Sequence, residues 1–427
     1  MNYHRGFHCR AGEAMNKKFL RVTVLFLISI IYFSAFIPPN LTGAENEHML
    51  FLTSQDESFQ FPFLKRMLTP GKDIHETRSN WISYGHYIYG YPFYLYSAIL
   101  ILPFRWLHGI QVLSQTKWIL LILRQFVSVL PMIIAIVILV VAQTRSHNTL
   151  LSCILFIFLL TTPGVVRNNI CWWHPDALSL LSVVLTLVFL YKDDQQFGWY
   201  FFLAAVSCGF SFAIKTVGCF FVFTIAAYLL SAMLLRKISL TKGIIYALMF
   251  IMIMFSVTIV SNPLLLKTPQ RNRIIEVHLE HHYYFTHGWL DGEPYSTGLK
   301  PWIPVFNKWY GKPFFILFSL VSMLIGSLIG KNKNLNRLIT SWVLPYSVYV
   351  IFAIAVKPDH YWLPVMIPMF SSILSLYRRN SNLFSIRNQN MSAFVNRLVN
   401  IMIFVIITIQ FVLNLSMDYQ LFKNTLG

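Results

Sequence analysis

Twelve apolar segments, most of them long enough to cross a lipid bilayer, divide this chain of 427 residues. A transmembrane helix needs roughly 20 apolar residues. The segments cover residues 20–37, 92–107, 118–142, 149–163, 177–191, 199–214, 217–235, 243–262, 313–330, 338–356, 360–377 and 398–415. Charged residues make up only 12% of the chain, too few to cover the surface of a soluble protein. The sequence therefore predicts an all-α, polytopic transmembrane helix bundle and excludes soluble, disordered and disulfide-rich folds. Because several segments are short, some helices are expected inside the bundle.

The basic residues of the chain are distributed as in a polytopic membrane protein. Lys and Arg outnumber Asp and Glu by 34 to 16, but they fall in short clusters between the apolar segments. The clusters lie in the N-terminal region and in residues 236–242, 331–337 and 378–397. Since basic residues concentrate on the cytoplasmic side of a membrane, all four clusters are placed inside. The excess charge therefore does not indicate nucleic-acid binding.

This orientation leaves both flanks of segment 92–107 on the outer side. The segment contains Pro92, Pro103 and Arg105, and we expect it to re-enter or to lie in the interface. The prediction is then about eleven spans, with the N-terminus inside and the C-terminus outside. Alternatively, this segment spans and a short later one does not. The predicted organisation is a cytoplasmic N-terminus (1–19), a transmembrane core (20–262) that includes the first outer loop (38–91), a second outer loop (263–312) and C-terminal transmembrane helices (313–427).

The outer side carries most of the polar chemistry, because all but three of the 16 acidic residues fall there. The first candidate is the pair Asp56-Glu57 in the first outer loop. An amphipathic stretch, 59–68, follows it and would lie as a helix in the membrane interface. A carboxylate held there can act as a general base towards a hydroxyl. The alternative is a pair of acids that only complements the dipole of a helix start.

A second candidate joins two spans on the outer side. It is the run from Arg167 to Asp176, which ends in Trp172-Trp173-His174-Pro175-Asp176. An ionisable residue beside a membrane helix is a functional hypothesis by default. Pro175 and Asp176 would equally suit the first turn of a helix.

Three cations near the outer face form a third candidate. Lys215 interrupts the apolar run 199–235, Arg124 lies inside an apolar segment, and Lys357 joins two others. A cation buried in a membrane has a high free-energy cost unless an anion pairs with it. A lipid-linked phosphate would be such an anion. The alternative is that these side chains reach lipid headgroups.

Two histidines in the second outer loop are weak candidates for metal ligands. His278 and His282 are four residues apart and would share one face of a helix. A metal site needs at least three converging ligands, and the sequence shows no tight metal motif. An interfacial, hydrogen-bonded His cluster is the alternative.

Taken together, these features resemble the GT-C superfamily of polytopic glycosyltransferases. Within it they are most similar to the protein mannosyltransferases and the lipid A aminoarabinose transferases. The likeness rests on the order of five motifs that share the outer face. These are Asp56-Glu57, the Tyr-rich run 84–92, Pro175-Asp176, Lys215 about 40 residues later, and Tyr361-Trp362-Leu363-Pro364.

The resemblance implies transfer of a sugar, with inversion, from a polyprenyl-phosphate donor on the non-cytoplasmic side. The implied roles are a base for Asp56, assistance or acceptor binding for Glu57, donor-phosphate contacts for Lys215, Arg124, His174 and Lys357, and cavity or acceptor contacts for Asp176, Tyr89 and Trp173. Some members use a divalent metal, so a metal is a possible cofactor.

The compact size suits a multi-pass enzyme of a bacterial inner membrane whose active site faces the periplasm. It would decorate a lipid-linked saccharide such as O-antigen. The implied partners are the lipid-linked donor, a saccharide, lipid or protein acceptor, membrane lipid, and possible contact with the donor-lipid synthase.

Two other functions stay open at this point. One is a polymerase of lipid-linked polysaccharide repeats, whose chemistry would lie in the loop 263–312. The other is a lipid-linked sugar flippase or another transporter. Transport predicts charges scattered through the middle of the bundle. Most charges here lie at helix ends, with Arg124 as the main exception, which favours an interfacial enzyme.

Overall fold

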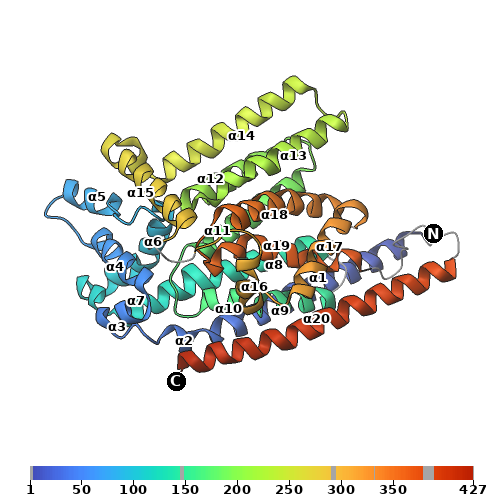
Figure 1. Ribbon diagram of the computed structural model, residues 1–427, viewed down its shortest axis with the longest axis horizontal. Coiled ribbons are helices and arrows are strands. Elements are labelled where there is room, and N and C mark those ends of the chain that lie inside the picture. Colours follow the sequence, from blue (N-terminus) through green and yellow to red (C-terminus); the bar gives the residue numbers. More distant parts are fainter. Residues whose placement is uncertain (1–2, 145–148, 290–294, 331, 378–388, 427) are drawn as a thin grey trace.

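The computed structural model describes residues 3–144, 149–289, 295–330, 332–377 and 389–426, with side chains from residue 19 and, in the last range, from residue 394. Every regular element in these ranges is a helix, which confirms the all-α prediction. Two groups of helices make up the molecule. Long helices run side by side as a bundle, and shorter helices gather at one end of it (Figure 1).

The bundle contains the apolar helices, most of them long and a few of them short. They are α1 (Tyr3–Ala35), α7 (Thr116–Leu123) continued through a π-turn, η2 (Arg124–Val129), into α8 (Leu130–Thr144), then α9 (Thr149–Leu160), α11 (Asp176–Asp193), α12 (Trp199–Ile214), α13 (Phe221–Leu234), α14 (Leu240–Ser261), α17 (Pro313–Ile329), α18 (Lys333–Ala353), α19 (Leu363–Ser371), η8 (Ser372–Leu376) and α20 (Gln389–Leu426). Within the described residues, five helices are long and apolar enough to cross a membrane alone, and two sharply bent pairs raise this to seven. The count of about eleven spans stays a prediction.

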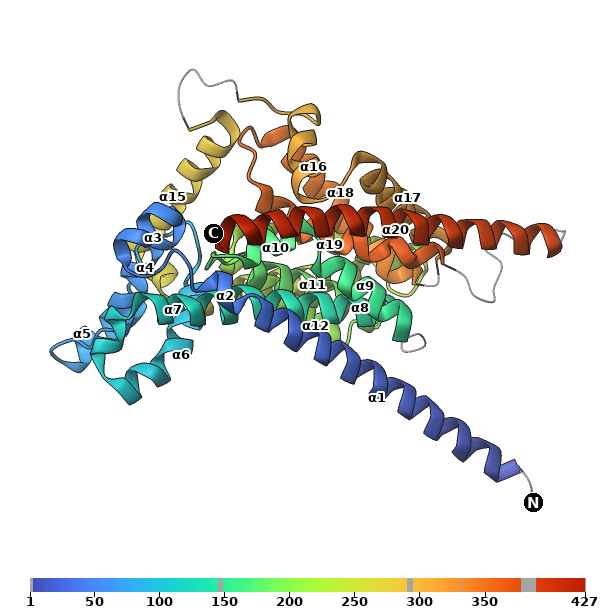
Figure 2. The same ribbon diagram turned by 90° about the horizontal axis from the view of Figure 1, so that it is seen from below.

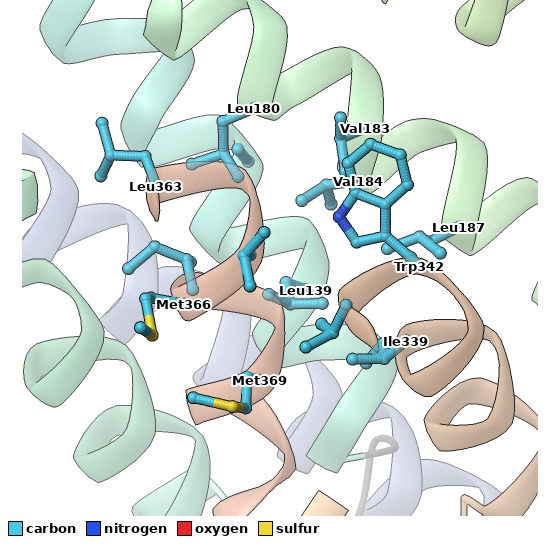
Figure 3. Packing of buried hydrophobic residues seen from close by; sticks show 14 of the residues in the cluster. Leu139, Leu180, Val183, Val184, Leu187, Ile339, Trp342, Leu363, Met366 and Met369 are labelled. Carbon is cyan, nitrogen blue, oxygen red and sulfur yellow. The ribbon is translucent and has the colours of Figure 1, made fainter. Parts of the chain in front are cut away.

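The shortest apolar helices lie at the centre of the bundle. Every residue of α19 is buried, and α19 packs against α8, α11 and α18. Figure 3 shows Leu363, Met366 and Met369 of this helix in one packed cluster with Leu139, Leu180 and Ile339. Because lipid is as apolar as these side chains, close packing rather than escape from water holds them together. A helix of nine residues could not span a bilayer by itself, so its burial agrees with the prediction of short internal helices.

The shorter helices form what we call the outer end, where α20 also ends; α1 begins at the opposite, inner end (Figures 1 and 2). They are α2 (Ile37–Asn40), α3 (Glu47–Thr53), α4 (Gln55–Leu68), α5 (Ile74–Ile82), α6 (Tyr91–His108), η1 (Ile110–Ser114), α10 (Pro163–Asn169), η4 (Thr216–Phe220), η5 (Pro263–Leu266), α15 (Thr268–His287), η6 (Lys300–Trp302), α16 (Ile303–Trp309) and η7 (Asp359–Trp362). The predicted outer loops are therefore folded, helical parts of the molecule.

Helix α6 corresponds to the segment whose crossing the sequence left open. It lies at the outer end beside α4 and α7, and it is not among the helices apolar enough to span (Figure 2). This position agrees with a segment in the interface. The apolar face of α4, including Phe61 and Leu64, packs into a second, aromatic-rich core beneath α6, while Phe59 is exposed.

Candidate active site

The first turn of α4 carries the two adjacent acids, and both carboxylate oxygens of one of them are bonded to other groups of the protein. Glu57 is completely buried and forms a bidentate ion pair with Arg124, with Nε–Oε1 at 2.9 Å and Nη2–Oε2 at 2.6 Å. The backbone N–H of Trp173 also donates to Glu57 Oε1, at 2.5 Å. Arg124 Nη1 donates to the carbonyl oxygens of Asn40 and Thr42. This pair therefore ties α4 to the π-turn, to the first outer loop and to the loop that precedes α11.

Asp56 has the opposite environment. Its side chain is half-buried, and in the described part of the chain it has no hydrogen-bond or ion-pair partner. It lines a cavity of about 440 Å³, which we call the Asp56 cavity, together with Arg167, Trp172 and Asn424. Asp56 lies in the first turn of α4. A carboxylate that is free of protein partners and lines a cavity is what a general base requires.

A second polar cluster joins four residues that the sequence singled out separately. The Tyr89 hydroxyl and His174 Nε2 share a hydrogen bond of 2.6 Å. His174 Nδ1 lies 2.6 Å from Asp176 Oδ2, and Lys215 Nζ donates to Asp176 Oδ1, also at 2.6 Å. Nδ1 and Oδ2 are in close contact, but they are not aligned for a hydrogen bond. We call Tyr89, His174, Asp176 and Lys215 the polar cluster.

Local backbone geometry brings this cluster together. Lys215 stands at the break between α12 and η4, where the chain is extended and the carbonyl of Ile214 is left free by the helix. The N–H of Gly90 donates to that carbonyl at 3.0 Å. A Cβ on Gly90 would lie 1.5 Å from the carbonyl oxygen of Ala213, so only glycine permits this approach. The contact holds Tyr89 next to the end of α12.

Burial sets the protonation of the cluster. It lowers the pKa of His174, against the opposing effect of Asp176, so the ring is neutral at neutral pH. It raises the pKa of Tyr89 well above the usual value, with Asp56 and Asp176 adding to the effect. Asp56 also opposes the lowering of the His86 pKa by burial. Asp56 is therefore close enough to act electrostatically on the side chains that border the cluster.

A second cavity lies on the Lys215 side of the cluster. It encloses about 320 Å³ and we call it the Lys215 cavity; its lining includes Lys215, Tyr361, His278, His281 and His282. Lys215 Nζ lies 4.8 Å from the centre of the Tyr361 ring. On the other side, Trp172 of the Asp56 cavity stacks on His174 at 4.1 Å. The Lys215 cavity thus reaches the polar cluster directly, and the Asp56 cavity reaches it only through Trp172.

The prediction of a metal is not tested, but the structure groups other potential ligands than the ones that the sequence suggested. Among the described residues, ligand atoms of His174, Asp176 and His360 lie within 4.8 Å of one another. His278 and His282 are not part of this group. The orphaned atoms Nδ1 and Oδ2 would fit an ion, whereas the ammonium of Lys215 already neutralises Asp176. A divalent metal held by these three residues would add positive charge to the site.

Two further predicted site residues line neither cavity. Lys357 Nζ donates to the carbonyls of Ser296, Ile354 and Ala355 and lies over the ring of Trp302. Trp173 is fully buried, stacked on Phe93, and its indole N–H donates to Ser97 Oγ. The structure shows neither of them facing a donor or an acceptor.

Sequence reasoning missed several lining residues. Trp172, Arg167 and Tyr361 belong to runs that the sequence had singled out, yet periodicity gave no reason to choose them over their neighbours. No sequence pattern pointed to Asn424, because it lines the Asp56 cavity only as a result of α20 ending near the start of α4.

The fold is similar to known glycosyltransferases, although no family model and no curated protein matches the sequence. The structure of ArnT from Cupriavidus metallidurans bound to undecaprenyl phosphate matches 88% of this chain and 63% of that chain, with a TM-score of 0.52 and 13% identity. The oligosaccharyltransferase AglB from Archaeoglobus fulgidus, in complex with an inhibitory peptide and a dolichol-phosphate, matches 94% and 56%, with a TM-score of 0.55 and 9% identity. This chain therefore spans less than two thirds of either. Both neighbours are GT-C enzymes, so the predicted fold is confirmed.

Proposed function

We propose that the protein is an integral-membrane glycosyltransferase that moves a sugar from a polyprenyl-phosphate donor to an acceptor hydroxyl. The observation that carries this proposal is the contrast within Asp56-Glu57. One carboxylate is saturated by Arg124, and the other is free and faces a cavity. The fold shared with enzymes solved with undecaprenyl phosphate or dolichol-phosphate supports the donor class.

The geometry suggests how the two cavities divide the reaction. The acceptor would occupy the Asp56 cavity, where Asp56 removes the proton of its hydroxyl. The acceptor oxygen attacks the anomeric carbon, the bond from this carbon to the phosphate oxygen breaks, and polyprenyl phosphate leaves towards Lys215. Lys215 stabilises the negative charge that develops on the leaving phosphate. Attack and departure on opposite sides invert the anomeric centre.

The remaining predicted residues receive more specific roles in this proposal. Tyr89, His174 and Asp176 hold Lys215 in place between the two cavities. Glu57 and Arg124 position α4 and thereby Asp56. Four of the five N–H groups of Arg124 are engaged within the protein, so we do not assign it to the donor phosphate.

The finer setting is part of the same proposal. We infer an acceptor that is a lipid-linked saccharide, such as O-antigen, and a bacterial inner membrane with the site facing the periplasm. The supporting observation is that both cavities lie at the outer end, opposite the basic clusters of the cytoplasmic side.

The test is a transfer assay in membranes with a panel of polyprenyl-phosphate sugars. Asp56→Asn should lower the transfer rate by at least about a hundredfold, the scale expected for loss of a general base. Asp73→Asn is the matched control, because Asp73 is exposed in the same loop and only caps α5. Equal activity of the Asp56 variant and wild type would refute the proposed base and favour the polymerase function, with its chemistry in 263–312.

A further inference from the structure

The inner end contains a cavity that the proposed reaction does not use. It encloses about 520 Å³ and is larger than either cavity at the outer end. Its lining comes from the last turn of α11, from α13 and from the start of α18. These ends lie opposite α4 and α15 (Figure 1). In the orientation expected from the basic clusters, the cavity is on the cytoplasmic side. We call it the inner cavity.

The inner cavity combines apolar walls with a basic rim. Leu190, Leu235 and Leu338 line it together with cations on two elements. The cations are Lys237, Lys333 and Arg337, all exposed. Its acid, Asp194, accepts a hydrogen bond of 2.9 Å from Asn334 Nδ2. The rim therefore keeps a net positive charge above hydrocarbon-lined walls.

Topology alone does not explain this gathering of charge. Lys192, Arg236 and Lys242 are basic residues of the same end, but they do not line the inner cavity. A positive-inside signal requires only that basic residues lie on the cytoplasmic side. It does not require three of them to surround one recess between helices.

The floor of the inner cavity is a rigid turn. Asp194, Gln195 and Phe197 adopt left-handed conformations, which are strained for residues other than glycine. Buried Asp193 holds the turn by accepting bonds from the N–H groups of Phe197 and Gly198 and from the Tyr228 hydroxyl. Gln195 Nε2 donates to Ser231 Oγ on α13. The recess is therefore shaped by side-chain contacts before any ligand arrives.

We propose that the inner cavity binds the phosphate headgroup of an anionic glycerophospholipid of the cytoplasmic leaflet. The phosphate would contact Lys237, Lys333 and Arg337, because basic pockets between helices on this side suit anionic headgroups. The acyl chains would follow the leucine-lined wall. Such a site ties the position of α13 and α18 to the lipid composition and is independent of the transfer chemistry.

The test titrates the purified, detergent-solubilised protein with phosphatidylglycerol and with phosphatidylcholine. The triple variant Lys237→Gln/Lys333→Gln/Arg337→Gln should bind phosphatidylglycerol at least tenfold more weakly, since each basic residue near a headgroup contributes roughly fivefold. The variant Lys192→Gln/Arg236→Gln/Lys242→Gln removes the same charge from the same end and should stay within about threefold of wild type. Ala227→Phe fills the cavity, keeps every charge and should also weaken binding tenfold.

Several results would overturn the proposal. Equal losses in the two triple variants would show a general effect of charge. Equal affinity for phosphatidylcholine, or full competition by millimolar inorganic phosphate, would show that no anionic lipid is recognised. Unchanged binding by Ala227→Phe would place the lipid elsewhere. Because binding is measured directly, these outcomes do not depend on the Asp56 assay.

Discussion

At the residue scale, side chains of the same chemical type have different contacts because their surroundings differ. Asp56 and Glu57 are adjacent carboxylates in one helical turn, yet Glu57 is bonded to Arg124 and Trp173 while Asp56 is free. Among the predicted phosphate-binding lysines, Lys215 lines a cavity and Lys357 donates to three carbonyls of its own surroundings.

Replacing Glu57 should lower the stability of the folded protein and not only the rate of transfer. Glu57→Gln leaves the buried guanidinium of Arg124 without its counter-charge, which costs about 3–5 kcal/mol. Thermal unfolding in detergent should show this loss. Glu47→Gln is the control, since its ion pair with Lys65 is exposed and worth at most about 1 kcal/mol. The double variant Glu57→Leu/Arg124→Leu should lose less stability than the sum of the two single replacements. Simple additivity would contradict a coupled pair.

Replacement of Lys215 and replacement of Lys357 should have different effects on kcat/KM. Lys215→Gln removes the charge proposed to stabilise the leaving phosphate and should lower kcat/KM by about a hundredfold or more. Lys357→Gln should change kcat/KM by less than about threefold, because its ammonium is engaged away from both cavities. Steady-state transfer assays at matched folded fraction measure both. A comparable loss in the two variants would contradict the division of roles.

At the element scale, α15 carries the histidines of the second outer loop to the Lys215 cavity. His281 packs against Phe285 at 4.3 Å, and burial, Lys215 and His278 lower its pKa to about 4. Burial also lowers the pKa of His278. The helix thus presents neutral imidazoles to the cavity near neutral pH.

The low pKa of His281 predicts a pH-dependent stability. The unfolded chain binds a proton near pH 6.5, whereas the folded protein binds it only near pH 4. Between these values the unfolded state holds more protons, so stability falls as the pH decreases. The melting temperature of wild type should drop between pH 6.5 and 4, and His281→Phe, which preserves the packing, should drop less. His287→Phe in the same helix is the control, and an identical pH profile for His281→Phe and wild type would refute this origin.

At the scale of the whole molecule, the two ends carry different chemical groups. The outer end holds Asp56, the polar cluster and their two cavities, and the inner end holds the basic rim. Helix α1 begins at the inner end, and α20 ends beside α2 at the outer end (Figure 1). The Phe36 and Phe422 rings, 5.3 Å apart, fix this contact. Opposite ends for the two termini require an odd number of crossings.

Reporter fusions can test this orientation. Alkaline phosphatase fused after Leu426 should be active and green fluorescent protein at the same point dark, because the end of α20 is expected outside. Fusions after Leu235, in the inner turn that follows α13, should give the reverse result. The same reporter active at both points would contradict the placement of Leu235 and Leu426 on opposite sides of the membrane.

Part of the site followed from the sequence. His174, Asp176 and Lys215 sit at the ends of apolar segments and lie in one polar cluster, whereas Asp56 was identified as part of an acidic pair before an amphipathic stretch. The ion pair between Glu57 and Arg124 was not predicted, although both residues were candidates. Its partners are 67 residues apart, and periodicity carries no information about such a contact.

The sequence by itself determined the membrane character, the helical class and the side on which chemistry is expected. These depend on apolar length and on the placement of charge, which are properties of short stretches of chain. Only the tertiary structure decided which carboxylate is free, which lysine faces a cavity and that α19 lies at the centre. Those outcomes depend on which distant groups approach within hydrogen-bond distance, and burial then fixes their charge and partners.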